Sequence, residues 1–154
     1  MNSVLARSIA DLSSRWRNHF SRWASLSKSG HLRRGARGEK LACRYLKYSG
    51  YKILLRNFRG RSGGEIDIVC RDNDTVVFVE VKTRASEDFG RPFEAVNREK
   101  QKRISRGALA WLRMLDNPDI LFRFDVVEVI IADDAKPRME LIKNAFPLSK
   151  PYLY

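Results

Sequence analysis

The chain has 154 residues, enough for one domain, and 44% of them are apolar, as in a globular protein with a buried core. Its 30 Lys and Arg against 18 Asp and Glu give a formal net charge of +12, which favours nucleic acid or an anionic membrane surface as partner over a merely soluble basic protein. No apolar run approaches the ~20 residues of a membrane span and no Gly-rich phosphate loop occurs, so stable membrane insertion and nucleotide hydrolysis have no support.

The N-terminal segment, residues 1–34, is set apart by its charge. It holds seven Arg or Lys against one acid, a net +6 and half of the total. Apolar residues recur at helical spacing from Leu5 to Trp23, which predicts an amphipathic helix, followed by a flexible linker over 25–30. Three interpretations remain open: an arm that binds phosphates or anionic lipid, a helix docked on the domain, and an organellar presequence. We therefore divide the chain into an extension, 1–34, and a domain, 35–154.

From Gly35 the pattern is that of an α/β domain. A helix is expected over residues 36–49, with Gly50 as its stop, and a strand from Tyr51 to Asn57. Two alternating strands, 65–71 and 75–82, are joined by polar residues. A long helix over 95–115, a β-branched strand over 122–131 and a short edge strand over 139–143 complete the order. This order predicts a mixed central sheet flanked by helices.

Cysteine and histidine offer no ligand set or triad. Cys43 lies in a predicted helix and Cys70 at the end of a predicted strand, so both are expected to be buried free thiols in a reducing compartment. His19 and His31 lie in the N-terminal extension, away from the expected core. These positions argue against a structural zinc site and favour a cytoplasmic protein.

The two strands joined near residue 73 carry the acids that matter for chemistry. Because side chains alternate along a strand, Glu65 and Asp67 share one face of the first strand, and Glu80 and Lys82 share one face of the second. The opposite faces are expected to be the core faces, and they hold only apolar residues: Ile66, Ile68, Cys70, Val77, Val79 and Val81.

The length of the turn decides whether these acids meet. A two-residue loop at Asn73-Asp74 places Asp67 opposite Glu80 and Glu65 opposite Lys82. A three-residue loop puts Asp67 and Glu80 on opposite faces unless a bulge restores the match. Carboxylates that face each other repel, so the pattern indicates either a site for a divalent cation or a solvated face neutralised by Lys82 and nearby arginines.

Gly64-Glu65-Ile66-Asp67 followed by Val79-Glu80-Val81-Lys82 resembles the bipartite motif of the PD-(D/E)XK nuclease superfamily. More closely, the stretch from Gly35 to Phe124 resembles the YraN family of bacterial proteins, which is related to archaeal Holliday-junction resolvases. Gly64-Glu65 stands where the superfamily has a Pro-Asp pair, and residues 1–34 lie outside the resemblance. The segments that carry it are Gly35-Ala36-Arg37-Gly38-Glu39, Gly50-Tyr51, Asn57, Gly64-Glu65-Ile66-Asp67, Phe78-Val79-Glu80-Val81-Lys82-Thr83-Arg84 and Lys100-Gln101-Lys102.

The resemblance implies a restriction-endonuclease-like core and an endonuclease that depends on Mg²⁺ or Mn²⁺. Asp67 would be the principal metal ligand, Glu80 the second, and the carbonyl of Val81 a third. Lys82 would orient or deprotonate the attacking water, or stabilise charge on the scissile phosphate.

Two helical residues and one further acid have weaker assignments. Glu39, on the first helix, would add a carboxylate directly or through water, or pair with an arginine. Gln101, on the second helix, would position water or substrate, or be merely exposed. Glu65 would bridge Lys82 or bind metal.

The resemblance also implies nucleic acid as partner, DNA rather than RNA and branched DNA in particular, and a homodimer. The rival hypothesis is a nucleic-acid-binding module on a nuclease-like fold, without turnover. The basic residues expected to contact phosphates, each with a solvated face as the alternative, are Arg84, Arg98, Lys100 and Lys102.

Overall fold

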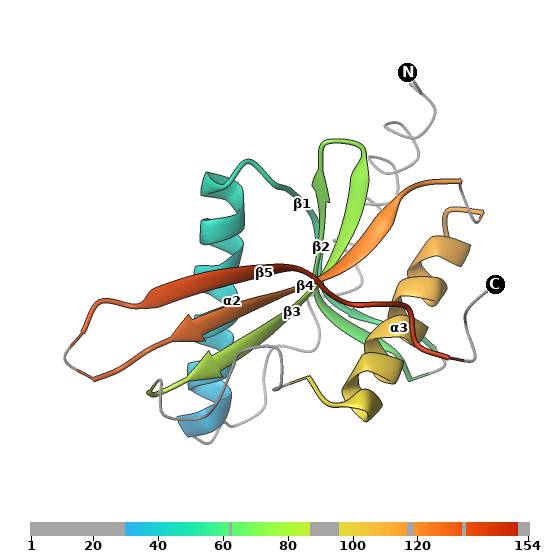
Figure 1. Ribbon diagram of the computed structural model, residues 1–154. Helices are drawn as coiled ribbons and strands as arrows, with labels where there is room; N and C mark the ends of the chain where they lie inside the picture. Colours follow the sequence, from blue (N-terminus) through green and yellow to red (C-terminus); the bar gives the residue numbers. More distant parts are fainter. Residues whose placement is uncertain (1–29, 62, 87–95, 117–118, 134, 151–154) are drawn as a thin grey trace.

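A computed structural model describes residues 30–61, 63–86, 96–116, 119–133 and 135–150 (Figure 1). The amphipathic helix predicted between Leu5 and Trp23 lies outside these residues. The elements in chain order are α2 (Gly30–Tyr48), β1 (Lys52–Arg59), β2 (Glu65–Asp72), β3 (Thr75–Arg84), α3 (Arg98–Arg113), β4 (Phe122–Ile130) and β5 (Arg138–Phe146).

The strands form one mixed sheet in the order β1-β2-β3-β4-β5. The first three strands make an antiparallel meander, β4 lies parallel to β3 after the crossover through α3, and β5 returns antiparallel to β4. The predicted mixed α/β sheet is confirmed. The final strand is longer than the expected 139–143 because its ladder with β4 extends from Arg138 to Phe146.

The two helices cover opposite faces of the sheet (Figure 1). Along β3, Val77 and Val79 pack with α2, whereas Val76 and Phe78 pack with α3. A strand that is buried on both faces has a continuous apolar sequence, and β3 therefore has Phe78 between valines. The prediction that the valine row alone faces a core is therefore wrong. Cys43 and Cys70 are buried free thiols on the α2 side, as predicted.

Strand β2 breaks its alternation at Asp67. Ile66 packs on the α3 side, but Ile68, two residues later, packs on the α2 side. The β2–β3 ladder ends at the pair Ile68–Val79, and beyond it the backbone N–H of Val81 donates to Asp67 Oδ2 at 2.8 Å. The shared face expected for Ile66 and Ile68 is wrong, because the chain turns the Asp67 carboxylate towards the backbone of β3.

The helix ends follow from their caps. After α2, Gly50 has φ +88°, and the N–H groups of Gly50 and Tyr51 donate hydrogen bonds to carbonyls of the last helical turn. This is the glycine C-cap that the sequence predicts. At its other end α2 begins at Gly30 rather than near residue 36, so it runs across the predicted boundary at residue 34. Asn97 caps α3 by accepting a hydrogen bond from the Lys100 N–H. Neither helix of the described residues is long and apolar enough to cross a membrane.

Candidate active site

A cleft of about 310 Å³ lies where α2 and α3 approach strands β2 and β3. Three carboxylates line it, and each comes from a different element: Glu39 from α2, Asp67 from β2 and Glu80 from β3. The complete lining is Arg34, Gly35, Glu39, Asp67, Glu80, Val81, Thr83 and Lys100. The residues predicted as metal ligands, together with the Glu39 of the first helix, thus share one cleft.

The tight turn of the β2–β3 hairpin brings two of these acids together. Asp72 pairs with Thr75, so the turn has the two predicted residues, and Asn73 adopts the positive φ (51°) that such a turn requires. The same register leads to the Ile68–Val79 pair, after which Asp67 and Glu80 are the next residues. The ladder stops one pair short of the predicted Asp67–Glu80 pairing.

Glu80 is a buried carboxylate held by two lysines. Its side chain is only 3% exposed. Lys82 Nζ lies 3.1 Å from Oε1, and Lys100 Nζ lies 3.1 Å from Oε2. The second contact lacks hydrogen-bond geometry, so Oε2 is buried without a hydrogen-bond donor. A buried carboxylate oxygen in this state retains lone pairs for another ligand.

Asp67 lies in an environment that resists its negative charge. Burial and the neighbouring Glu80 raise the pKa of Asp67 to about 7, although the Val81 N–H and the Lys100 ammonium act in the opposite direction. A carboxylate crowded by another carboxylate is stabilised by added positive charge.

Lys100 reaches the cleft from the first turn of α3. Its ammonium donates to Glu65 Oε1 at 2.7 Å, and Arg103 holds the other oxygen of Glu65 at 3.0 Å. The hydrogen bond from Lys100 lowers the pKa of Glu65. Burial works against the charge on Lys100, but Glu80 and Glu65 outweigh it and raise its pKa. The predicted pairing of Glu65 with Lys82 is wrong, because Lys82 contacts Glu80 instead.

Two glycines allow α2 and α3 to pack closely against the strands that carry the site. A Cβ at Gly38 would clash with the side chain of Thr83, so this glycine allows α2 to lie against β3 beside Glu39. A Cβ at Gly64 would clash with the backbone of Gly107, so this pair allows α3 to approach the start of β2, where Glu65 meets Lys100.

The other predicted residues are placed as follows. Gln101 donates its amide to the Val96 carbonyl at 2.9 Å and is not among the lining residues of the cleft. Arg84 pairs with Glu128 at 2.9 Å, and Arg98 and Lys102 are exposed on α3. Sequence reasoning assigned Lys100 to phosphate and missed its contact with Glu80, since no local pattern shows how α3 docks on β2.

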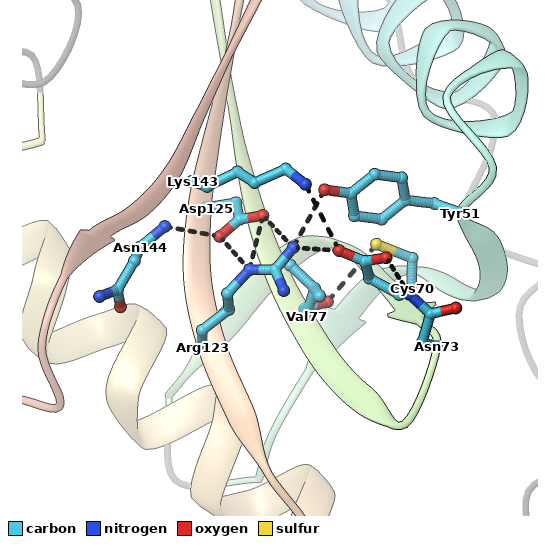
Figure 2. Close-up of polar contacts among 9 residues, drawn as sticks. Tyr51, Cys70, Asn73, Val77, Arg123, Asp125, Lys143 and Asn144 are labelled. Carbon is cyan, nitrogen blue, oxygen red and sulfur yellow. Dashed lines mark hydrogen bonds and ion pairs between the residues drawn. The ribbon is translucent and has the colours of Figure 1, made fainter.

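A second polar cluster lies at the other end of β3 (Figure 2). Asp125 is completely buried, and it accepts hydrogen bonds from Arg123 Nε at 3.0 Å and from the Asn144 N–H at 2.9 Å. The same guanidinium donates to Asp72 at 2.8 Å and to the Tyr51 hydroxyl at 3.0 Å. These contacts tie the hairpin turn to β4 and β5 and so fix the strands whose far ends carry Asp67 and Glu80.

The fold and the cleft define a mixed α/β protein with clustered acids on a strongly basic chain. The model of the uncharacterised protein family UPF0102 matches residues 38–129, and the chain belongs to this family. It is 51% identical over 115 residues to a UPF0102 protein of Geobacter sulfurreducens, covering 75% of this chain and 89% of that protein. A UPF0102 protein of Symbiobacterium thermophilum is 47% identical over 112 residues, 73% of this chain and 94% of its own length. These matches confirm the resemblance to the YraN family, and Glu39, Asp67 and Glu80 all lie within the matched residues.

Proposed function

We propose that this chain is a metal-dependent endonuclease that hydrolyses phosphodiester bonds in nucleic acid, on a restriction-endonuclease-like core. The observation that carries the proposal is the convergence of Asp67 and Glu80 on one cleft in a chain of net charge +12. A protein that only binds phosphates has no use for acids that face them, because they repel the ligand.

The donor set of the cleft fits a hard divalent cation. Mg²⁺ and Mn²⁺ prefer oxygen ligands, and the cleft is lined by the carboxylate residues Asp67, Glu80 and Glu39. Val81 also lines the cleft, and its carbonyl would be a further ligand. Glu80 Oε2 forms an ion pair with Lys100 but accepts no hydrogen bond, so its lone pairs can serve a metal ion if Lys100 moves away. Two lysines contact Glu80 in the described conformation. Among the described residues, no three His, Cys, Asp or Glu lie close enough together in this conformation to hold a metal ion.

Each residue of the cleft has a task in this chemistry. When bound, a divalent cation neutralises charge on the phosphate and makes a coordinated water more acidic. Asp67 and Glu80 hold the cation, and Glu39 adds a carboxylate directly or through water. Lys82, which Glu80 keeps at 3.1 Å, orients the attacking water or stabilises charge on the phosphate. Gln101 lies outside the cleft lining, and its hydrogen bond to the Val96 carbonyl holds the residues that precede α3 in place.

Basic side chains around the cleft supply affinity for the backbone of the substrate. Arg34 lines the cleft, and Arg98, Lys102 and Arg103 are exposed on α3. Such contacts bind phosphates without reading sequence. Branched DNA as the substrate and a homodimer as the active form follow from the family resemblance and are part of the proposal.

The test is a cleavage panel of branched, flapped, single-stranded and double-stranded DNA and RNA with Mg²⁺, Mn²⁺ or chelator. Asp67→Ala, Glu80→Ala and Lys82→Ala should each abolish the metal-dependent product. Asp74→Ala is the matched control, because it removes an exposed carboxylate from the hairpin turn. Cleavage that persists unchanged in Asp67→Ala would overturn the proposal.

The rival function, a binding module without turnover, makes a different prediction for the same proteins. It expects no metal-dependent product from the parent chain on any substrate, and only changes of affinity among the variants. For the nuclease, Asp67→Ala and Glu80→Ala without metal should bind nucleic acid as well as the parent or better, because repulsion of phosphate falls.

A further inference from the structure

The ammonium of Lys100 lies between two carboxylates of β2 and β3. Its Nζ is 2.7 Å from Glu65 Oε1 and 3.1 Å from Glu80 Oε2. The residue sits in the first turn of α3, where its backbone N–H donates to the Asn97 side chain at 2.9 Å. The helix cap therefore fixes the backbone of Lys100, while its ammonium can contact either Glu65 or Glu80.

The two contacts differ in kind. The contact with Glu65 is a hydrogen bond, and Arg103 holds Glu65 from its other oxygen at 3.0 Å. The contact with Glu80 is an ion pair that leaves Oε2 without a hydrogen-bond donor. Lys100 can therefore lose its Glu80 contact and keep its hydrogen bond to Glu65, because Arg103 holds Glu65 in place independently.

We propose that Lys100 is a resident counter-ion of Glu80, that a divalent cation displaces it, and that Glu65 retains it beside the cleft. The inference rests on the proposed function, since it takes Asp67 and Glu80 as ligands of that cation. An ammonium and a metal ion both require the lone pairs of Oε2, so they compete for one oxygen. Lys100 is then a positioning residue, which acts on the metal through Glu80.

Glu65 has a defined part in this exchange. It offers Lys100 an alternative partner and so lowers the cost of moving the ammonium away from Glu80. Without Glu65 the ammonium would depend on Glu80 alone and would compete more strongly with metal. Lys82 differs, because it contacts Oε1 of Glu80 and belongs to the same strand.

The experiment measures Mn²⁺ binding to the full chain by calorimetry at constant ionic strength, without substrate. Lys100→Met keeps the apolar stem and removes the competitor, so Mn²⁺ should bind about tenfold more tightly. Glu65→Gln should weaken binding by about threefold. Lys47→Met removes an exposed lysine in the last turn of α2, outside the cleft lining; this variant is the control and should stay within about twofold of the parent.

The double variant Glu65→Gln/Lys100→Met distinguishes competition between Lys100 and the metal ion for Glu80 from a general electrostatic effect of the two charges on metal affinity. If Glu65 acts through Lys100, the double variant should match Lys100→Met within about twofold. If both residues act only as distant charges, their effects should add and bring the double variant back towards the parent. Additive effects, or a Lys100→Met variant no tighter than the parent, would overturn the inference.

The same titrations keep this inference apart from the proposed function. If Mn²⁺ binding requires Asp67 but its affinity is unchanged in Lys100→Met, the inference is overturned and the nuclease proposal remains intact. Absence of any Asp67-dependent binding overturns both. Circular dichroism verifies the fold of each variant, and Lys100→Gln, which also lacks the charge, replaces Lys100→Met if that variant does not fold.

Discussion

Replacing Asp67 by Asn should make the metal-free protein more stable. The carboxylate of Asp67 is partly buried beside Glu80, and its pKa is raised from 3.8 to about 7. Ionised Asp67 therefore destabilises the fold at pH 8. A neutral amide removes this charge, and its oxygen can still accept the hydrogen bond that the Val81 N–H donates at 2.8 Å.

The magnitude follows from the proton-binding equilibrium. A tenfold change in a binding constant is worth ~1.4 kcal/mol, so a pKa raised from 3.8 to about 7 sets an upper bound of about 4 kcal/mol. Solvent at the mouth of the cleft screens part of this penalty. We expect Asp67→Asn to raise the free energy of unfolding by about 2 kcal/mol, or the melting temperature by about 5–10 °C.

Thermal melts at pH 8 with chelator measure this difference. Asp72→Asn, the same change on the same strand, is the control and should lower the melting temperature, because Arg123 and Lys143 stabilise that carboxylate. Adding Mg²⁺ at ten times its dissociation constant should stabilise the parent by about 1.4 kcal/mol and leave Asp67→Asn unchanged. A destabilised Asp67→Asn variant, or one stabilised equally by metal, would refute the reasoning.

Two further predictions concern the framework of the site. Gly38→Ala should lower the free energy of unfolding by about 1–3 kcal/mol in a denaturant titration, because the added methyl group meets Thr83. Gly35→Ala is the control and should be neutral or slightly stabilising, because a Cβ at Gly35 meets open space. Equal effects of the two substitutions would show that α2 tolerates a wider separation from β3. Asp72 has its pKa lowered by the hydrogen bond from Arg123, so its contribution is present above its unfolded pKa of 3.8 and is lost as pH falls through the still lower folded value. Acid melts of the parent and Asp72→Asn should therefore converge at low pH, and a gap that stays constant down to pH 3 would contradict this account.

The hairpin could be predicted from the sequence because its determinants are local. Alternation on both strands and the Asn73-Asp74 turn place Asp67 near Glu80, and the Val81–Asp67 hydrogen bond spans only 14 residues. The break in β2 was missed because Ile66 and Ile68 look alike in a pattern of apolar and polar residues. Only the packing on both faces shows that they belong to different sides of the sheet.

Contacts between distant segments could not be predicted in the same way. Lys100 meets Glu65 across 35 residues of sequence, and Arg123 meets Tyr51 across 72. Both depend on how whole elements dock, which is decided by close backbone approaches such as that of Gly64 to Gly107. Propensity and periodicity describe single elements, so the partners of Lys100 and Arg123 appear only once the elements are assembled.

The charges of the cleft suggest an order of binding for the proposed reaction. Glu39, Asp67 and Glu80 place three carboxylates where a phosphodiester would approach, and Arg34, Lys82 and Lys100 offset their charge. Without metal the carboxylates repel the phosphodiester locally. A divalent cation at Asp67 and Glu80 would add two positive charges at that point and attract the phosphodiester. Metal and substrate should therefore bind with positive coupling, because each supplies the charge that the other requires.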